Sequence, residues 1–128
     1  MNIDHVAKFT DEAGAADALP SYRAGDGWDT SRVLAGVSII TADAVWDNTD
    51  PQNPVLVPPE QTLPGFWLAI GLPELSQDLI ALPGNALRFA ANRETGQIIY
   101  TAPDLNVALL ASARVSPVFA GSQYQFGG

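Results

Sequence analysis

The segment Pro64-Gly65-Phe66-Trp67-Leu68-Ala69-Ile70-Gly71-Leu72-Pro73 is the most apolar run of the chain, and a proline stands at each of its ends. Its aromatic and β-branched content fits a strand that is buried on both faces. A buried helix would need about 10 or more residues, without the internal glycine and the flanking prolines found here. We therefore predict that this segment is the central strand of a sheet around which the rest of the chain is built.

The size and composition of the chain are those of one globular domain. It has 128 residues, of which 47% are hydrophobic and 16% are charged. A domain of this size buries about two-thirds of the surface of its unfolded chain, and disordered chains are far less hydrophobic. We expect a single domain over residues 1–120 and a glycine-ended flexible tail over residues 121–128.

The chain is strongly acidic, because 14 Asp and Glu residues stand against 6 Lys and Arg residues and give a net charge of −8. Such a charge repels nucleic-acid backbones and anionic membranes, so we expect neither as a partner. No apolar run approaches the roughly 20 residues that cross a bilayer, and the N-terminus lacks the pattern of a secretory signal. We expect a cytoplasmic protein, or a virion protein if the gene is phage-derived.

Short strand and helix patterns follow one another along the rest of the chain. Strands are predicted at residues 3–9, 33–40, 54–59, 86–91, 97–102 and 114–120, and residues 44–46 either continue the second of these or begin its partner. Helices are predicted at residues 13–19 after an N-cap at Thr10 or Asp11, at residues 74–82, and at residues 105–113 after a cap at Asp104. The connection over residues 92–96 ends in glycine and predicts a hairpin.

This order of elements predicts an α+β domain, with a mainly antiparallel sheet and two or three short helices packed on it. A β-sandwich with short helical turns is the alternative. The prolines around residues 55–57 confine that strand to a sheet edge, because proline cannot donate a hydrogen bond to a ladder.

The chain lacks the residue patterns of the common enzyme classes. Cysteine is absent, which excludes disulfides, thiolate nucleophiles and cysteine-ligated zinc. No serine lies in a Gly-x-Ser-x-Gly motif, and there is no Gly-x-Gly-x-x-Gly or Walker-type loop. His5 is the only histidine, so any histidine-based triad or metal site must use it, and it lies near a terminus, where chains are often mobile. We predict a protein without catalytic activity, catalytic or metal residues, or cofactor.

Two pairs of loop aspartates are candidate ligands. Asp26 with Asp29, or Asp47 with Asp50, could form a carboxylate pair for glycoside chemistry or a hard-cation site. Neither pair matches an EF-hand, and aspartates in such loops commonly form turns and caps. Turn formation is the favoured interpretation, and Asp47 with Asp50 is the better candidate for a cation.

The three tryptophans, Trp28, Trp46 and Trp67, are candidate platforms for stacking on a sugar. Their large apolar rings also fill cores without any ligand. For Trp28, which stands in a polar loop, the favoured interpretation is a lid that folds back over the edge of the core.

Several short motifs occur in a recognisable order: Phe9-Thr10-Asp11-Glu12-Ala13, Leu19-Pro20, Gly27-Trp28, Ala44-Val45-Trp46-Asp47, Pro64-Gly65-Phe66-Trp67 and Leu82-Pro83. In this order the chain resembles small uncharacterised proteins encoded in phage and prophage structural gene clusters, over most of its length. The resemblance implies a non-enzymatic virion or tail-associated component, or an assembly factor. It carries over no functional residues.

We accordingly predict a structural or assembly protein that acts through protein–protein contacts, as a homo-oligomer or as part of a phage-tail-like particle. Edge strands and the C-terminal tail are its expected contact elements, because exposed strands bind by adding to a neighbour's sheet. The alternatives are a small-ligand or carbohydrate-binding module that uses the loop tryptophans and aspartates, and a hydrolase with an acidic pair. The candidate contact residues are Trp28, Asp29, Trp46, Asp47, Asp50, Tyr124 and Phe126.

Overall fold

The computed structural model describes residues 3–48, 52–105 and 114–116. Its strands are β1 (Ile3–Phe9), β2 (Arg23–Ala24), β3 (Gly27–Trp28), β4 (Val33–Ile40), β5 (Val45–Asp47), β6 (Val55–Val57), β7 (Phe66–Leu72), β8 (Leu87–Asn92), β9 (Ile98–Thr101) and β10 (Arg114–Ser116). Its α-helices are α1 (Glu12–Ala18) and α2 (Gln77–Ile80), and single 3-10 turns occur at η1 (Pro20–Tyr22) and η2 (Pro83–Asn85).

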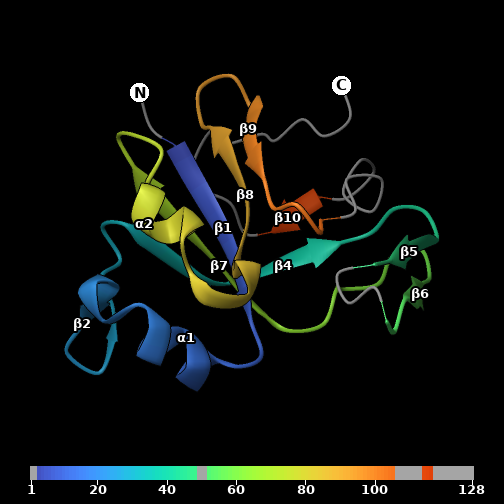
Figure 1. Cartoon of the computed structure of the whole chain (residues 1–128), viewed down its shortest axis with the longest axis horizontal. Helices are drawn as coiled ribbons and strands as arrows, with labels where there is room; N and C mark the ends of the chain where they lie inside the picture. The colour runs from blue at the N-terminus through green and yellow to red at the C-terminus, as the bar shows by residue number, and fades with distance from the viewer. Residues whose placement is uncertain (1–2, 49–51, 106–113, 117–128) are drawn as a thin grey trace.

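Six of the strands form one sheet in the order β10-β4-β7-β1-β8-β9, with every neighbouring pair antiparallel. The helices lie beside this sheet, and the β5–β6 ribbon projects beyond one end of it (Figure 1). The other two ladders in the described part of the chain, β2–β3 and β5–β6, each have only two strands. The predicted mainly antiparallel sheet with short helices packed on it is thus confirmed.

The centre of the sheet is formed by β7 and β1. β7 pairs with β1 on one side and with β4 on the other, and its residues from Trp67 to Ile70 are at most 3% exposed. The apolar run around these residues is therefore the central strand, as predicted. β1 is equally central, because it pairs with both β7 and β8. The expectation that the neighbourhood of His5 belongs to a mobile terminus is wrong.

Each face of the sheet carries its own apolar cluster. Side chains alternate along β7, so Leu68 and Ile70 point to one face while Trp67 and Ala69 point to the other. The first face is covered by helical residues, and the second by loop residues and the inner side of β6; the covering residues are Ala15, Leu19 and Leu79 on the first face, and Val57, Leu63, Ala102 and Leu105 on the second. Burial on both faces explains why β7 lacks polar alternation.

Helix α1 agrees with its prediction to within a residue. Asp11 is its N-cap, and the Oδ1 atom of Asp11 accepts a hydrogen bond from the Gly14 N–H at 2.8 Å. The helix ends at Ala18, just before Leu19 and Pro20. A seven-residue helix is too short to be stable alone, and it relies on the packing of Ala15 and Leu19 against the sheet.

Helix α2 is shorter than the predicted helix over residues 74–82. Ser76 caps it, with Oγ accepting from the Leu79 N–H at 3.2 Å. The N–H of Ser76 donates to His5 Nε2 at 3.0 Å, which fixes the start of the helix at this point. At the other end Leu82 has an extended backbone (φ −57°, ψ 139°), the conformation favoured before a proline.

The predicted hairpin over residues 86–102 is confirmed as β8 and β9. Asn92 closes its turn, since its backbone carbonyl accepts from the Gly96 N–H at 2.7 Å and its Oδ1 accepts from the Glu94 N–H at 2.9 Å. Gly96 has a φ of 75°, a left-handed conformation that glycine adopts readily.

The last described strand, β10, pairs with β4 at the edge of the sheet and begins at Arg114, as predicted. Beyond Leu105, the predicted third helix lies outside the described residues, as does the tail over residues 121–128. Asp104, its expected cap, accepts a hydrogen bond from Arg88 at 3.0 Å. No helix in the described part of the chain is long and apolar enough to span a membrane.

Candidate functional site

The β5–β6 ribbon is the most exposed apolar element that the structure describes. Its register places Trp46 opposite Leu56, between the pairs Val45–Val57 and Asp47–Val55. Successive side chains of a strand point to opposite faces, so Val45 and Val57 turn inward against the core while Trp46 and Leu56 turn outward. The ribbon therefore has one face that anchors it and one face that is presented to solvent.

The base of the ribbon is fixed to the sheet through Thr41, which is fully buried. The Thr41 N–H donates to the Gln61 carbonyl at 2.9 Å, and the Thr41 carbonyl accepts from the Glu60 N–H at 2.7 Å. The Thr41 hydroxyl donates to the Pro58 carbonyl at 2.8 Å. These bonds join the residue after the end of β4 to the segment that follows β6. The base of the ribbon is therefore fixed to the sheet.

Large apolar side chains with high exposure gather on this ribbon. Trp46, Val55 and Leu56 are 55%, 55% and 52% exposed, and the fourth such residue in the described ranges is Ile99 on β9, at 41%. We call the outward pair, Trp46 and Leu56, the ribbon patch; Val55 pairs with Asp47 and lies on the other face of the ribbon. Proline flanks β6 on both sides, at Pro54 and Pro58, which limits extension of its ladder. A cluster of this kind on a soluble surface marks an interaction site more often than scattered apolar residues do.

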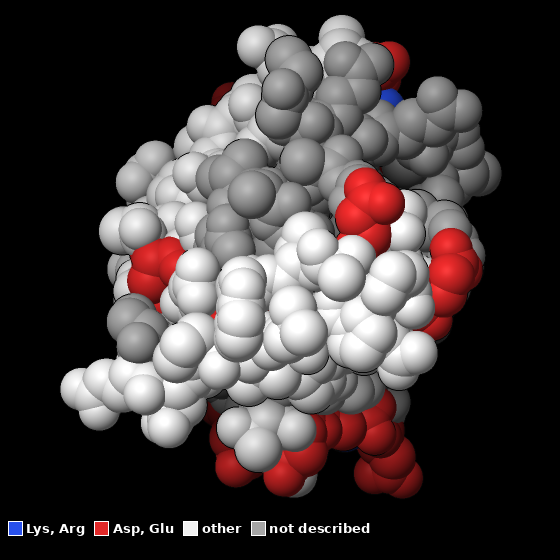
Figure 2. Space-filling view, turned by 90° about the vertical axis from the view of Figure 1, so that its right-hand side faces the viewer, with Lys and Arg blue, Asp and Glu red and all other residues white. Residues whose placement is uncertain are grey.

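Acidic side chains lie near the ribbon patch. No Lys or Arg occurs anywhere from residue 33 to residue 87, whereas Asp43 and Glu60 stand exposed at the base of the ribbon. Figure 2, which views this end of the molecule, shows an uncharged surface bordered by acidic side chains. The field around the patch favours a positively charged partner surface.

Trp28 does not share a site with Trp46. The β2–β3 hairpin that carries Trp28 lies at the opposite end of the molecule from β5 and β6 (Figure 1). Trp28 is half-buried against the core, its Nε1–H donates to Glu12 Oε2 at 3.1 Å, and the Arg23 guanidinium stacks on its ring at 4.8 Å. It therefore has the lid position that the sequence favoured, and the two tryptophans do not form a common platform.

Asp29 forms a turn. Its Oδ1 accepts from the N–H and the hydroxyl of Ser31 at 3.1 and 2.6 Å, and its Oδ2 pairs with Arg32 Nε at 2.9 Å. The hydrogen bonds from Ser31, and then those from Arg32, lower the pKa of the Asp29 carboxyl. The carboxylate is thus used within its own loop, while Asp26 stands exposed at the tip of the hairpin, at a distance from the ribbon.

The remaining candidates are buried or lie outside the described residues. Asp47 is only 7% exposed in β5, and Asp50, Tyr124 and Phe126 are not among the described residues. Trp67 is a core residue, 3% exposed, and its Nε1–H donates to the Pro64 carbonyl at 3.1 Å. Within the described ranges no three His, Asp or Glu side chains are grouped so that they could hold a metal ion. The cation site at Asp47 and Asp50 stays a prediction.

His5 is a buried structural residue of β1. Its Nδ1–H donates to the Ile70 carbonyl at 3.1 Å, and its Nε2 accepts from the Ser76 N–H at 3.0 Å. Burial lowers the pKa of the imidazole, against opposing contributions from the Ile70 and Ile3 hydrogen bonds and the nearby Asp4 charge. Both ring nitrogens are engaged in joining β1 to β7 and to the start of α2.

Sequence reasoning named Trp46 as a contact residue but missed Val55 and Leu56. Part of their signal is present in the sequence, because prolines on both sides confine this short strand to an edge. Comparisons with protein-family models, with curated proteins and with solved structures found no match for this chain. The resemblance to phage and prophage proteins therefore stays a prediction.

Proposed function

We propose that this protein is a structural or assembly component that acts through protein–protein contacts, with the ribbon patch as its docking element. The observation that carries the proposal is the outward pair Trp46 and Leu56, each more than half exposed on a ribbon whose base is hydrogen-bonded to the sheet. A fixed base means that little conformational entropy is lost when the ribbon is bound.

Covering this pair contributes part of the binding free energy of a contact. Fully burying one large apolar side chain stabilises a structure by about 1.5–3 kcal/mol. Since about half of each side chain is still exposed, covering Trp46 and Leu56 together contributes roughly 1.5–3 kcal/mol. Each 1.4 kcal/mol is about a tenfold change in affinity. Tryptophan is also among the residues that most often dominate a protein interface.

The partner surface that best fits the ribbon patch is apolar with a basic rim. The segment from residue 33 to residue 87, which includes the ribbon, carries acidic residues and no Lys or Arg. Two copies of this surface would repel each other, so a different protein, or a different face of the same protein, is the better complement. A phage-tail or virion component is the narrower form of the proposal, and it rests on the resemblance of the sequence motifs.

Site-directed photo-cross-linking tests the proposal in cells that naturally carry the gene. Benzoylphenylalanine replaces Trp46 in one variant, and in a matched control it replaces Ile99, the exposed apolar residue of β9. We expect a discrete cross-linked protein from position 46 and none, or a different pattern, from position 99. An adduct with a second copy of the chain would support the contact function and identify self-association.

The opposite result is equally clear. Absence of a discrete adduct from position 46, or identical adducts from positions 46 and 99, would contradict the proposal. The identity of an adduct also decides the narrower form, since a tail or capsid protein supports it and a protein from outside such a particle opposes it.

A further inference from the structure

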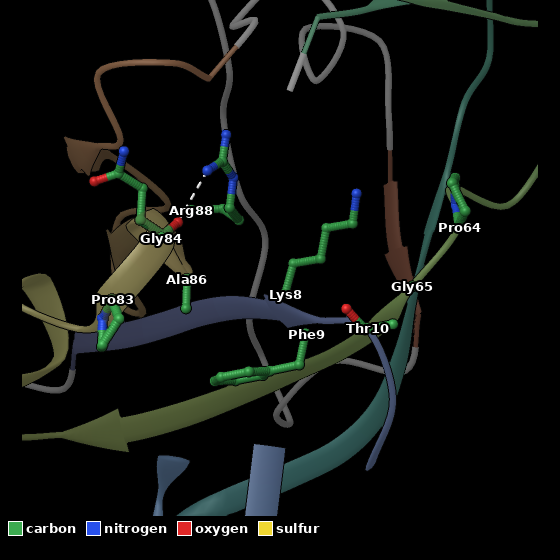
Figure 3. Close-up of a pocket in the computed structure, with 10 residues that line it drawn as sticks. Lys8, Phe9, Thr10, Pro64, Gly65, Pro83, Gly84, Ala86 and Arg88 are labelled. Atoms are coloured by element: carbon green, nitrogen blue, oxygen red, sulfur yellow. Dashed lines mark hydrogen bonds between the residues drawn. The ribbon is translucent and has the colours of Figure 1, made fainter. Parts of the chain in front are cut away.

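A cavity of about 470 Å³ lies beside the end of β1. Its walls come from the end of β1 (Lys8, Phe9, Thr10), from Pro64 and Gly65 before β7, and from the segment of η2 and β8 that includes Pro83, Gly84, Asn85, Ala86 and Arg88 (Figure 3). This volume falls within the range of about 300–1,000 Å³ that is typical of small-ligand sites.

Arg88 is the buried cation of this cavity. The pairing of β1 with β8 shifts register between Val6, opposite Phe89, and Ala7, opposite Leu87, so Arg88 is the extra residue of a bulge. Bulges re-aim side chains and are frequent beside functional sites. The bulge leaves Arg88 only 2% exposed while its side chain lines the cavity.

The guanidinium of Arg88 is only partly satisfied. Its Nη1 donates to the Asn85 carbonyl at 2.9 Å and to Asp104 Oδ1 at 3.0 Å. Its Nε and Nη2 are buried and have no hydrogen-bond partner. Buried donors without a partner cost about 1–3 kcal/mol, so such groups call for an explanation. Nε–H and Nη2–H form the side edge of the guanidinium fork, which matches the two oxygens of a carboxylate or phosphate.

Lys8 supplies a second cation on the same side of the sheet. Figure 3 shows the Lys8 and Arg88 side chains extending from adjacent strands to one side, and the Nη1 bond of Arg88 directed toward Asn85, away from Lys8. The Lys8 ammonium lies 5.8 Å from the centre of the Trp67 ring, and no ion pair of Lys8 occurs within the described ranges. Two cations thus face one cavity of a protein whose net charge is −8.

Gly65 makes room for Lys8. A Cβ atom at this position would come within 2.8 Å of Lys8 Cε and 3.2 Å of Lys8 Cγ, and the φ of Gly65 is +103°, which side chains rarely adopt. The stem of Lys8 therefore lies directly over the Gly65 backbone. The stem of Lys8 thus packs on the backbone while its ammonium lies beside the Trp67 ring.

We propose that this cavity binds a small organic anion, with a carboxylate or phosphate held between the guanidinium of Arg88 and the ammonium of Lys8. Pro64 and Pro83 offer apolar walls to the body of the ligand, and the Thr10 hydroxyl stands at the rim. The guanidinium and the ammonium bind the anionic group of the ligand. The apolar walls favour a ligand that has an apolar body over a free inorganic ion. This site is independent of the ribbon patch and of the contact function.

Isothermal titration calorimetry with four probes tests this assignment. Phenyl phosphate and benzoate carry an apolar body with each of the two head groups, inorganic phosphate carries the head group alone, and benzyl alcohol is the neutral control. We expect saturable binding of phenyl phosphate or benzoate that weakens with added salt, weaker binding of inorganic phosphate, and none of benzyl alcohol. The tighter of the first two probes identifies the head group.

Matched variants link the binding to the cavity. Lys8→Met and Arg88→Lys should each weaken binding by about tenfold or more, because each removes a charge-assisted contact. Arg23→Met is the control, since it also removes a cation stacked on a tryptophan ring, but outside the cavity, and it should leave binding unchanged. Circular dichroism establishes that each variant is folded, and Lys8→Met keeps the test decisive if Arg88→Lys does not fold.

Any of three results would overturn the assignment. The unaltered protein could show no saturable binding of any of the anions at millimolar concentration, or benzyl alcohol could bind as tightly as benzoate. The third result is a loss of affinity in Arg23→Met that equals the loss in Lys8→Met.

Discussion

Acidification should destabilise this protein through His5, whose imidazole is held in its neutral form in the folded state. The ring accepts a hydrogen bond at Nε2 from the Ser76 N–H and donates one from Nδ1 to the Ile70 carbonyl. A proton added at Nε2 would face the Ser76 N–H, and the resulting charge would be fully buried. Burial therefore lowers the pKa of His5 below its ordinary value of 6.5.

The direction and size of the effect follow from proton linkage. Below pH 6.5 the unfolded chain takes up a proton at His5 that the folded chain resists. The free energy of unfolding then falls by up to about 1.4 kcal/mol per pH unit until the folded-state pKa is reached. From about pH 6.5 to about pH 5 the loss amounts to at most about 2 kcal/mol. That is a large part of a typical total of about 5–15 kcal/mol.

Urea unfolding followed by tryptophan fluorescence, over pH values from about 5 to 8, measures this slope. In His5→Gln the titrating group is gone, so the slope over this window should disappear even if the variant is less stable at every pH. The reasoning fails if His5→Gln retains the slope of the unaltered protein, or if the unaltered protein is equally stable across the window.

Three further substitutions test the packing and capping on which the fold depends, each by urea unfolding at neutral pH. Asp11→Ala should lower the free energy of unfolding by about 1 kcal/mol, because it removes the N-cap of α1. An unchanged free energy of unfolding would show that this cap does not stabilise the protein. Leu68→Ala should cost about 2–5 kcal/mol, since Leu68 is fully buried, whereas the exposed Leu56→Ala should cost far less; equal costs would contradict the assigned burial. Arg93→Met should cost about 3–5 kcal/mol, because it removes the guanidinium 2.7 Å from the fully buried Asp4 carboxylate. Adding Asp4→Asn to Arg93→Met should restore part of that stability, and a further loss would oppose the ion-pair interpretation.

The sequence was most informative where a single segment determines its own structure. The run around Trp67 and Ile70 has no polar face, so burial on both sides of a central strand was its predicted environment. The turn that ends in Gly96 and the cap at Asp11 are likewise local features, in which one residue type supplies a required conformation or acceptor.

Prediction failed where the deciding contact joins distant segments. Helix α2 starts at Gln77 because the N–H of Ser76 binds His5, which lies 71 residues away along the chain. No local pattern in residues 74–82 contains that contact. The same contact shows why the position of His5 near the start of the chain was a poor guide to its environment.

The candidate sites likewise include one with a local sequence signal and one without. The prolines around β6 predicted an edge strand, and Trp46 was a candidate contact residue, but the pairing of β5 with β6 as a ribbon was not predicted. Arg88 could not be found in this way, because an arginine in a predicted strand is normally a solvent-facing residue. The bulge that buries it depends on the register between β1 and β8, which the sequence of neither strand determines alone.

The most direct test of the proposed contact function is the yield of the cross-linked adduct from position 46, compared between chains with Leu56 and chains with Leu56→Ser. Leu56 lies directly opposite position 46 on the outward face of the ribbon. If this face is the docking surface, losing its leucine contact should lower partner affinity by about tenfold, and the adduct should decrease accordingly at limiting partner concentration. An adduct of undiminished yield in Leu56→Ser would contradict the claim that the ribbon patch is the surface through which this protein binds its partner.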